Sequence, residues 1–100
     1  MKRLVEAMGS CIASDRITVD GAPVGYMYRE EPDNALDSGW RFFAGDESDE
    51  YCGDTTNFEI YDVNTIANYD PSIVSYLESP LGSAFERPRE GDPFLPCPVS

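Results

Sequence analysis

An acidic run in the middle of the chain is the first place to look for chemistry. Residues 46–54 read Asp-Glu-Ser-Asp-Glu-Tyr-Cys-Gly-Asp, so five carboxylates fall within nine positions. Closely spaced carboxylate oxygens are the ligands that calcium prefers. The run departs from the EF-hand pattern, because tyrosine takes the place of glycine at its sixth position and Asn57 replaces glutamate at its twelfth. We therefore predict no metal site here.

Residues suited to acid–base or nucleophilic catalysis are scarce. The chain has no histidine, and its three cysteines, Cys11, Cys52 and Cys97, are widely spaced. Without histidine the usual base that activates a nucleophile is missing, and we expect free thiols that are buried or half-buried. Carboxylates on a solvated turn also lack the burial that separates the pKa values of a hydrolytic pair. We predict no enzyme activity and no cofactor.

Charge is the strongest feature of the composition. Nineteen acidic residues oppose seven basic ones, a net charge of −12, and residues 30–62 hold eleven acids and one base, Arg41. Such a field disfavours nucleic acid and anionic membranes as partners and attracts a basic protein or toxin. The alternative is that these acids only keep the surface solvated. The candidate binding residues are Asp33, Asp37, Trp40, Asp46, Glu47, Asp49, Glu50, Tyr51 and Asp54.

The aromatic residues leave two interpretations open. Trp40 is either a core residue or an anchor for a partner. Arg41, surrounded by acids, is expected to pair inside the chain with Asp37 or Asp62. Four half-apolar side chains suit either a packed sheet face or a binding face: Tyr26, Tyr28, Tyr51 and Tyr61.

Short strands must position these residues. Alternating apolar residues and a β-branched or aromatic content predict strands at residues 10–14, 16–19, 23–29, 39–44, 58–63 and 83–87. Asp20-Gly21, between two of these segments, predicts a two-residue hairpin. The segment 39–44 has aromatic residues on both faces, so we expect it in the centre of the sheet.

Two helices are expected beside the strands. Asp46 is a candidate N-cap for a short helix over residues 46–51. Asp70-Pro71 is typical of an N-cap followed by the first helical position, and apolar spacing extends that helix over 71–79. Residues 64–69 are ambiguous between one helical turn and an irregular segment.

These elements indicate an α+β fold. We predict a single small domain with a twisted, mainly antiparallel sheet of about five strands and one or two short helices. Residues 1–9 form a lead-in, 10–87 the domain and 88–100 a proline-rich tail. The tail is expected to be extended and to stay out of the sheet interior, with Phe94 and Leu95 able to dock on the core. Strand order and oligomeric state are not predicted.

The sequence also bears on location. It contains no stretch of about 18 apolar residues, which a membrane-spanning helix needs. The basic pair Lys2-Arg3 precedes an apolar run that Glu6 interrupts, unlike a secretory signal. We expect a cytoplasmic protein.

Five blocks of sequence carry a family resemblance. They are residues 11–14, 24–30, 37–47, 60–65 and 80–87, and the block from Asp37 to Glu47 is the most distinctive. In this order they resemble a bacterial family long carried as a domain of unknown function. That family is also described as immunity protein family thirty-three of polymorphic toxin systems. The resemblance spans residues 10–87. It implies a small cytoplasmic bacterial protein that neutralises a toxin by direct binding, with no catalytic residues to assign.

Two functions follow as hypotheses. In the first, an acidic face made by residues 46–54 with Asp33 and Asp37 docks on a basic toxin or another basic protein. In the alternative, the chain is a ligand-binding or regulatory domain with a pocket between the sheet and the helix at 71–79. Binding that weakens as salt rises favours the first hypothesis.

Overall fold

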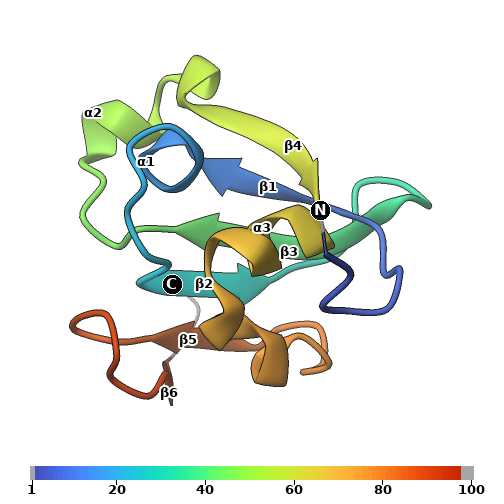
Figure 1. The fold of residues 1–100 in the computed structure, drawn as a ribbon. Helices are drawn as coiled ribbons and strands as arrows, with labels where there is room; N and C mark the ends of the chain where they lie inside the picture. The colour runs from blue at the N-terminus through green and yellow to red at the C-terminus, as the bar shows by residue number, and fades with distance from the viewer. Residues whose placement is uncertain (1, 98–100) are drawn as a thin grey trace.

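The computed structural model describes residues 2–97 and contains a six-stranded sheet with short helices (Figure 1). The helices are α1 (Asp15–Thr18), α2 (Asp49–Cys52) and α3 (Val63–Tyr69), and the two 3-10 helices are η1 (Thr55–Asn57) and η2 (Pro71–Tyr76). The strands are β1 (Ser10–Ser14), β2 (Tyr26–Arg29), β3 (Asp37–Phe43), β4 (Phe58–Asp62), β5 (Ala84–Glu86) and β6 (Leu95–Pro96). The predicted α+β class is confirmed.

The strand order in the sheet is β4-β1-β3-β2-β5-β6. β1 and β3 are parallel, and every other neighbouring pair is antiparallel. A parallel pair needs a long connection, which residues 15–36 supply through α1 and β2. The predicted central strand is confirmed, because β3 lies between β1 and β2.

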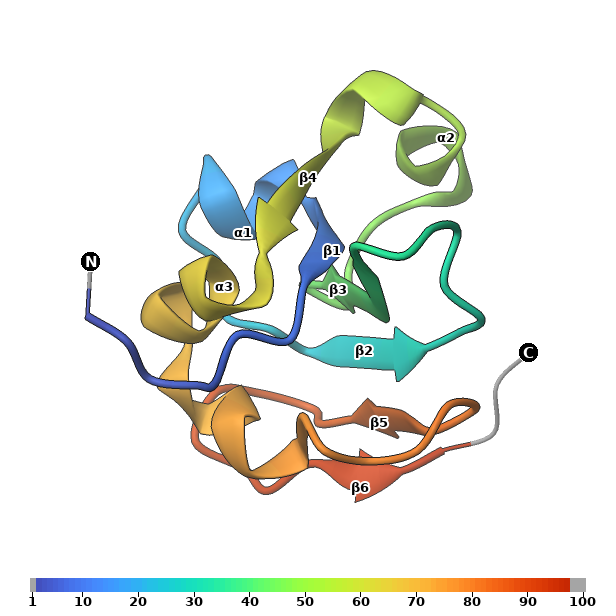
Figure 2. The same ribbon diagram turned by 90° about the vertical axis from the view of Figure 1, so that its right-hand side faces the viewer.

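The two faces of the sheet differ in what covers them. Side chains alternate between faces along a strand, and directly paired residues share a face. Met27 is paired with Phe42, so both lie on one face, whereas Tyr26 is paired with Phe43 on the other. Figure 2 shows α1 and α3 on one side of the sheet and α2 toward the other. We call the helix-covered side the core face and the opposite side the open face.

The core lies between the core face and the helices. Its largest fully buried side chains include Trp40, Phe42 and Met27 from the sheet and Ile66 and Ile73 from the helices. Trp40 also donates its indole N–H to the carbonyl of Leu77 at 3.0 Å. A buried indole that keeps a hydrogen-bond partner avoids the cost of an unpaired donor. Trp40 is therefore a core residue, in agreement with the first of its two interpretations.

The predicted strand at 16–19 is wrong, and so is the hairpin at Asp20-Gly21. Ser14 caps α1, because its hydroxyl oxygen accepts from the backbone N–H of Arg16 at 3.1 Å. Ile17 then points into the core and is fully buried. The cap and this burial override the β-propensity of the segment. Val19 and Asp20 form a turn after the helix, and Gly21 follows them.

Two helical segments follow β4, and a cap was predicted for the second of them. Asp62 caps α3 by accepting from the N–H of Asn64 at 2.8 Å, so residues 64–69 are helical. Asp70 caps η2, with Pro71 at its first position, as expected. η2 is a 3-10 helix that ends at Tyr76, so it is shorter than the predicted 71–79.

The chain after β5 packs on the domain through residue 97. Phe94 is 5% exposed and belongs to the core, whereas Leu95 is 58% exposed. β6 adds to the edge of the sheet beside β5, which keeps proline out of the sheet interior. Residues 98–100 of the predicted tail lie outside the described residues.

Candidate binding site on the open face of the sheet

Aromatic rings line the open face. Tyr26, Tyr28 and Phe43 contact one another, with ring centroids 5.7–5.9 Å apart. Phe43 also contacts Phe58 at 5.6 Å, and Phe58 contacts Tyr51 of α2 at 5.9 Å. These separations are in the range of favourable ring pairs. The five residues form one continuous patch, the aromatic strip, and all five side chains are partly exposed.

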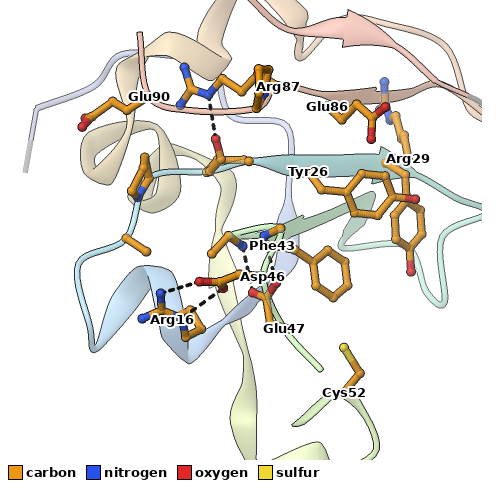
Figure 3. Close-up of a pocket in the computed structure, with 18 of the residues that line it drawn as sticks. Arg16, Tyr26, Arg29, Phe43, Asp46, Glu47, Cys52, Glu86, Arg87 and Glu90 are labelled. Carbon is orange, nitrogen blue, oxygen red and sulfur yellow. Dashed lines mark hydrogen bonds and ion pairs between the residues drawn. The ribbon is translucent and has the colours of Figure 1, made fainter. Parts of the chain in front are cut away.

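A hollow of about 1290 Å³ lies over this strip, and we call it the aromatic groove. Tyr26, Tyr28 and Phe43 form its floor, and its walls come from the segments around α2, after Arg29 and after β5. Figure 3 shows the rings of Tyr26 and Phe43 between Glu86 on one side and Glu47 and Cys52 on the other. Segments far apart in the sequence thus build one concave surface.

Five carboxylates around the groove make no ion pair within residues 2–97, and we call them the rim carboxylates. They are Glu31, Glu47, Asp49, Glu86 and Glu90. Glu47 accepts from the backbone N–H groups of Ala44 and Gly45 at 2.8 and 2.9 Å, which fixes its position after β3. The other four are exposed to solvent. The groove therefore carries unneutralised negative charge at its edge.

The arginines that line the groove are held by partners within the chain. Arg16 pairs with Asp46 at 2.8 Å and with Asp20 at 3.1 Å, and Arg89 pairs with Asp92 at 3.4 Å. Arg29 donates to two backbone carbonyls. Arg87 pairs with a buried carboxylate. These cations are directed to internal acceptors and leave the rim carboxylates free.

A second group of acids surrounds Arg41 at the other end of β3. Asp37 receives two hydrogen bonds from the Arg41 guanidinium, at 2.9 and 2.8 Å, and Glu30 receives one at 2.6 Å. Asp33 lies 3.6 Å from the same guanidinium. The Arg41 side chain is 3% exposed, so this cluster is part of the fold. The expected pairing of Arg41 with Asp37 is confirmed.

The hydrogen bonds of this cluster explain the shifted pKa values of Asp37 and Arg41. Hydrogen bonds from Arg41, and then from the backbone N–H groups of Asp33 and Gly39, hold the pKa of Asp37 well below its ordinary value of 3.8. The Asp37 carboxylate in turn raises the pKa of Arg41. Hydrogen bonds to the charged form of a group stabilise that form. Asp37 is therefore an internal counterion of Arg41.

The predicted binding residues fall into three groups. Trp40 and Asp37 are buried in the fold. Asp46 and Asp54 are exposed but engaged, Asp46 with Arg16 and Asp54 with the N–H and hydroxyl of Thr56. The remaining residues lie at the groove, on α2 or at the Arg41 cluster; they are Asp33, Glu47, Asp49, Glu50 and Tyr51. Binding by any of them stays a prediction.

The short helix near the groove starts later than expected. Ser48 caps α2 by accepting from the N–H of Tyr51 at 3.0 Å. Asp46, the predicted cap, is held by Arg16. α2 consequently turns Asp49 and Cys52 toward the groove.

The floor residue Phe43 and three rim residues, Glu31, Glu86 and Glu90, were not among the predicted binding residues. Tyr26 and Tyr28 were expected on either a packed sheet face or a binding face. The sequence indicated that the two tyrosines lie together, because Tyr26 and Tyr28 alternate along one strand and so share a face. Burial, with the nearby Glu30 carboxylate, raises the pKa of the Tyr28 phenol. Burial and the charges of Cys97 and Glu86 do the same for Tyr26. Both phenols are therefore neutral at physiological pH.

The free thiols lie in different environments. Cys11 is buried, Cys97 is half-buried and Cys52 is exposed, so the expectation of burial is wrong for Cys52. Within residues 2–97 no three side chains of histidine, cysteine, aspartate or glutamate are grouped as metal ligands would be.

The space predicted for a pocket between the sheet and η2 is filled by side chains. Trp40, Ile73 and Leu77 are buried there with exposures of 0–2%. A smaller hollow of about 480 Å³ lies between η2 and residues 90–94. The aromatic groove is the larger of these two hollows.

Comparison with known proteins defines the class to which this fold and groove belong. The model of the immunity protein Imm33 domain matches residues 11–96, which is most of the chain. The chain belongs to this family of immunity proteins, and the suspected resemblance is confirmed. No curated protein and no solved structure matches the chain. Among the described residues, no helix is long and apolar enough to cross a membrane.

Proposed function

We propose that this chain is a cytoplasmic immunity protein that neutralises a bacterial toxin by direct contact, without catalysis. Its family membership supports the immunity role. The single observation that carries direct contact is the uncovered aromatic groove with its unpaired rim carboxylates. Surfaces that combine exposed aromatic rings with one sign of charge are typical of protein interfaces.

The charge of the chain favours a basic partner. A net charge of −12 attracts a positively charged toxin and raises the rate of encounter. The groove is also larger and more open than the enclosed pockets of roughly 300–1,000 Å³ that hold small molecules. This shape supports a macromolecular partner over a small ligand.

The test uses a toxin domain encoded by a gene that adjoins the gene of this chain, once one is identified. We expect the full chain to protect cells that express this toxin and to form a complex with the purified toxin on a sizing column. Affinity measured by calorimetry should fall as salt rises from about 50 to 500 mM, because screening weakens the charge attraction. A toxin that neither binds nor is neutralised would refute the proposal. A rise of the melting temperature with a metabolite, without any effect of basic proteins, would favour a ligand-binding domain.

A further inference from the structure

The floor of the aromatic groove is made of rings that remain partly exposed to a partner. Tyr26 and Tyr28 make no hydrogen bond through their hydroxyl groups within residues 2–97, and the Tyr28 and Phe43 rings are stacked at an angle of 14°. The negative face of an aromatic ring attracts a cation. The partly exposed rings of the floor therefore offer an aromatic surface that a planar, positively charged group can contact.

The rim of the groove also favours a positively charged occupant. Glu86 is the cross-strand neighbour of Tyr26, and Glu31 lines the same groove. Glu47 is fixed after β3 by the N–H groups of Ala44 and Gly45. Arg16, Arg87 and Arg89 are already paired with acids, and Arg29 donates to backbone carbonyls. An anionic occupant would therefore be repelled by the rim carboxylates, and a purely apolar one would gain nothing from them. A cationic side chain can pair with the rim carboxylates and contact the aromatic rings of the floor at the same time.

The chain already uses arginine against aromatic rings in its own interior. The Arg87 guanidinium lies 4.3 Å from the centre of the Phe94 ring, and that of Arg29 lies 5.8 Å from Trp40. A guanidinium suits such contacts better than an ammonium group, because it is planar, weakly hydrated and able to bind a carboxylate through two N–H groups.

We propose that the aromatic groove takes an arginine side chain of the toxin, stacked on Tyr28 and Phe43 and held by the rim carboxylates. This inference rests on the proposed function and names the chemistry of its contact. It also moves the centre of binding from the acidic surface of α2 to the open face of the sheet.

The first test measures toxin affinity of groove variants. We expect Tyr28→Leu, which keeps an apolar side chain but removes the ring, to weaken binding about tenfold, and Tyr28→Phe to change it less than about twofold. Tyr69→Leu, at an exposed ring of α3, should have no effect. Glu86→Gln should weaken binding about threefold, whereas the matched Glu78→Gln, at an exposed residue outside the groove, should not. Circular dichroism verifies that each variant is folded.

The second test uses the wild-type chain with a short Gly-Arg repeat peptide followed by NMR. We expect the signals of Tyr26, Tyr28 and Phe43 to shift with the arginine peptide and not with its citrulline counterpart, which lacks the charge. This measurement needs no toxin and no folded variant.

The outcomes separate the two proposals. If the toxin binds with equal affinity to wild type and to folded Tyr28→Leu, the groove inference is overturned while the immunity function stands. If the toxin does not bind wild type at all, the immunity function fails, and the peptide titration still decides the inference. Peptide shifts confined to α2, with none at the floor rings, would also overturn it.

Discussion

Asp70 and Arg87 form a buried ion pair that joins three segments of the chain. The Nη2 atom of Arg87 lies 2.6 Å from Oδ2 of Asp70, and the two side chains are only 2% and 10% exposed. The same carboxylate oxygen accepts from the N–H of Val24 at 2.9 Å, and Arg87 Nε donates to the Val24 carbonyl. The pair thus holds the entry to β2, the start of η2 and the end of β5 together beneath the groove.

Breaking this pair should be costly. We expect Asp70→Asn to lower the free energy of unfolding by about 3 kcal/mol, because it leaves the buried guanidinium without a compensating charge. Urea denaturation measures the loss. Arg89→Ala removes an exposed ion pair and is the matched control, with little change expected. An Asp70→Asn variant as stable as wild type would contradict the structural role of the pair.

The Asp37–Arg41 contact should make stability depend on pH. The pKa of Asp37 is lowered in the folded state, so its contribution is complete above the unfolded value near 3.8 and is lost as pH falls toward the folded pKa. Asp37→Asn should therefore destabilise the protein most above about pH 5, and the difference from wild type should shrink below about pH 4. Denaturation curves across this range test it, and a difference independent of pH would count against it.

Gly39 should not tolerate a side chain. Its φ is +88°, and a Cβ there would collide with the backbone carbonyl of Glu30. Gly21 also has a positive φ, +79°, but a Cβ there would meet no atom within 4 Å. We expect Gly21→Ala to cost about 1 kcal/mol from backbone strain alone. Gly39→Ala should cost at least about 2 kcal/mol more, since the backbone must shift. Equal losses in thermal melts would rule out the collision.

The burial of Trp40 in the core can be tested by substitution and by fluorescence. Trp40→Phe removes the indole hydrogen bond to Leu77 and leaves a small cavity, so we expect a loss of about 1–3 kcal/mol. Wild-type fluorescence, which comes from this single tryptophan, should shift to longer wavelength on unfolding. Tyr69→Phe, at an exposed ring, is the control and should melt as wild type does. A wild-type emission typical of solvated indole would argue against the buried position.

The three thiols should react at very different rates. Burial raises the pKa of Cys11 to about 12, so its reactive thiolate is scarce and shielded. Iodoacetamide should modify exposed Cys52 first, then Cys97, and Cys11 only after unfolding. Peptide mass spectrometry follows each site. Modification of Cys11 in the native protein at the rate of Cys52 would contradict this order.

Local signals predicted the centre of the sheet well. Trp40 and Phe42 alternate with Arg41 and Phe43, so aromatic residues lie on both faces, which identified β3 as a central strand. Asp70-Pro71 identified a helix start, because capping depends on neighbouring residues only. At residues 15–18 the same kind of reasoning failed, since burial of Ile17 against distant residues outweighed local β-propensity.

The candidate site was harder to predict because it is assembled from distant segments. The acidic run was visible in the sequence, but which carboxylates are free depends on arginines brought from elsewhere, such as Arg16 against Asp46. The alternation of Tyr26 and Tyr28 indicated a shared face. That Phe43 and Phe58 would extend it depends on strand order, which no local pattern specifies.

The parallel pairing of β1 with β3 has a consequence for how the chain folds. The two strands are neighbours, yet residues 15–36 separate them, so joining them closes a long loop at an entropic cost. β2 and β3 are nearer in sequence and pair as antiparallel strands. We expect this two-stranded unit to form first and β1 to dock on β3 afterwards, because β1 must close the longer loop.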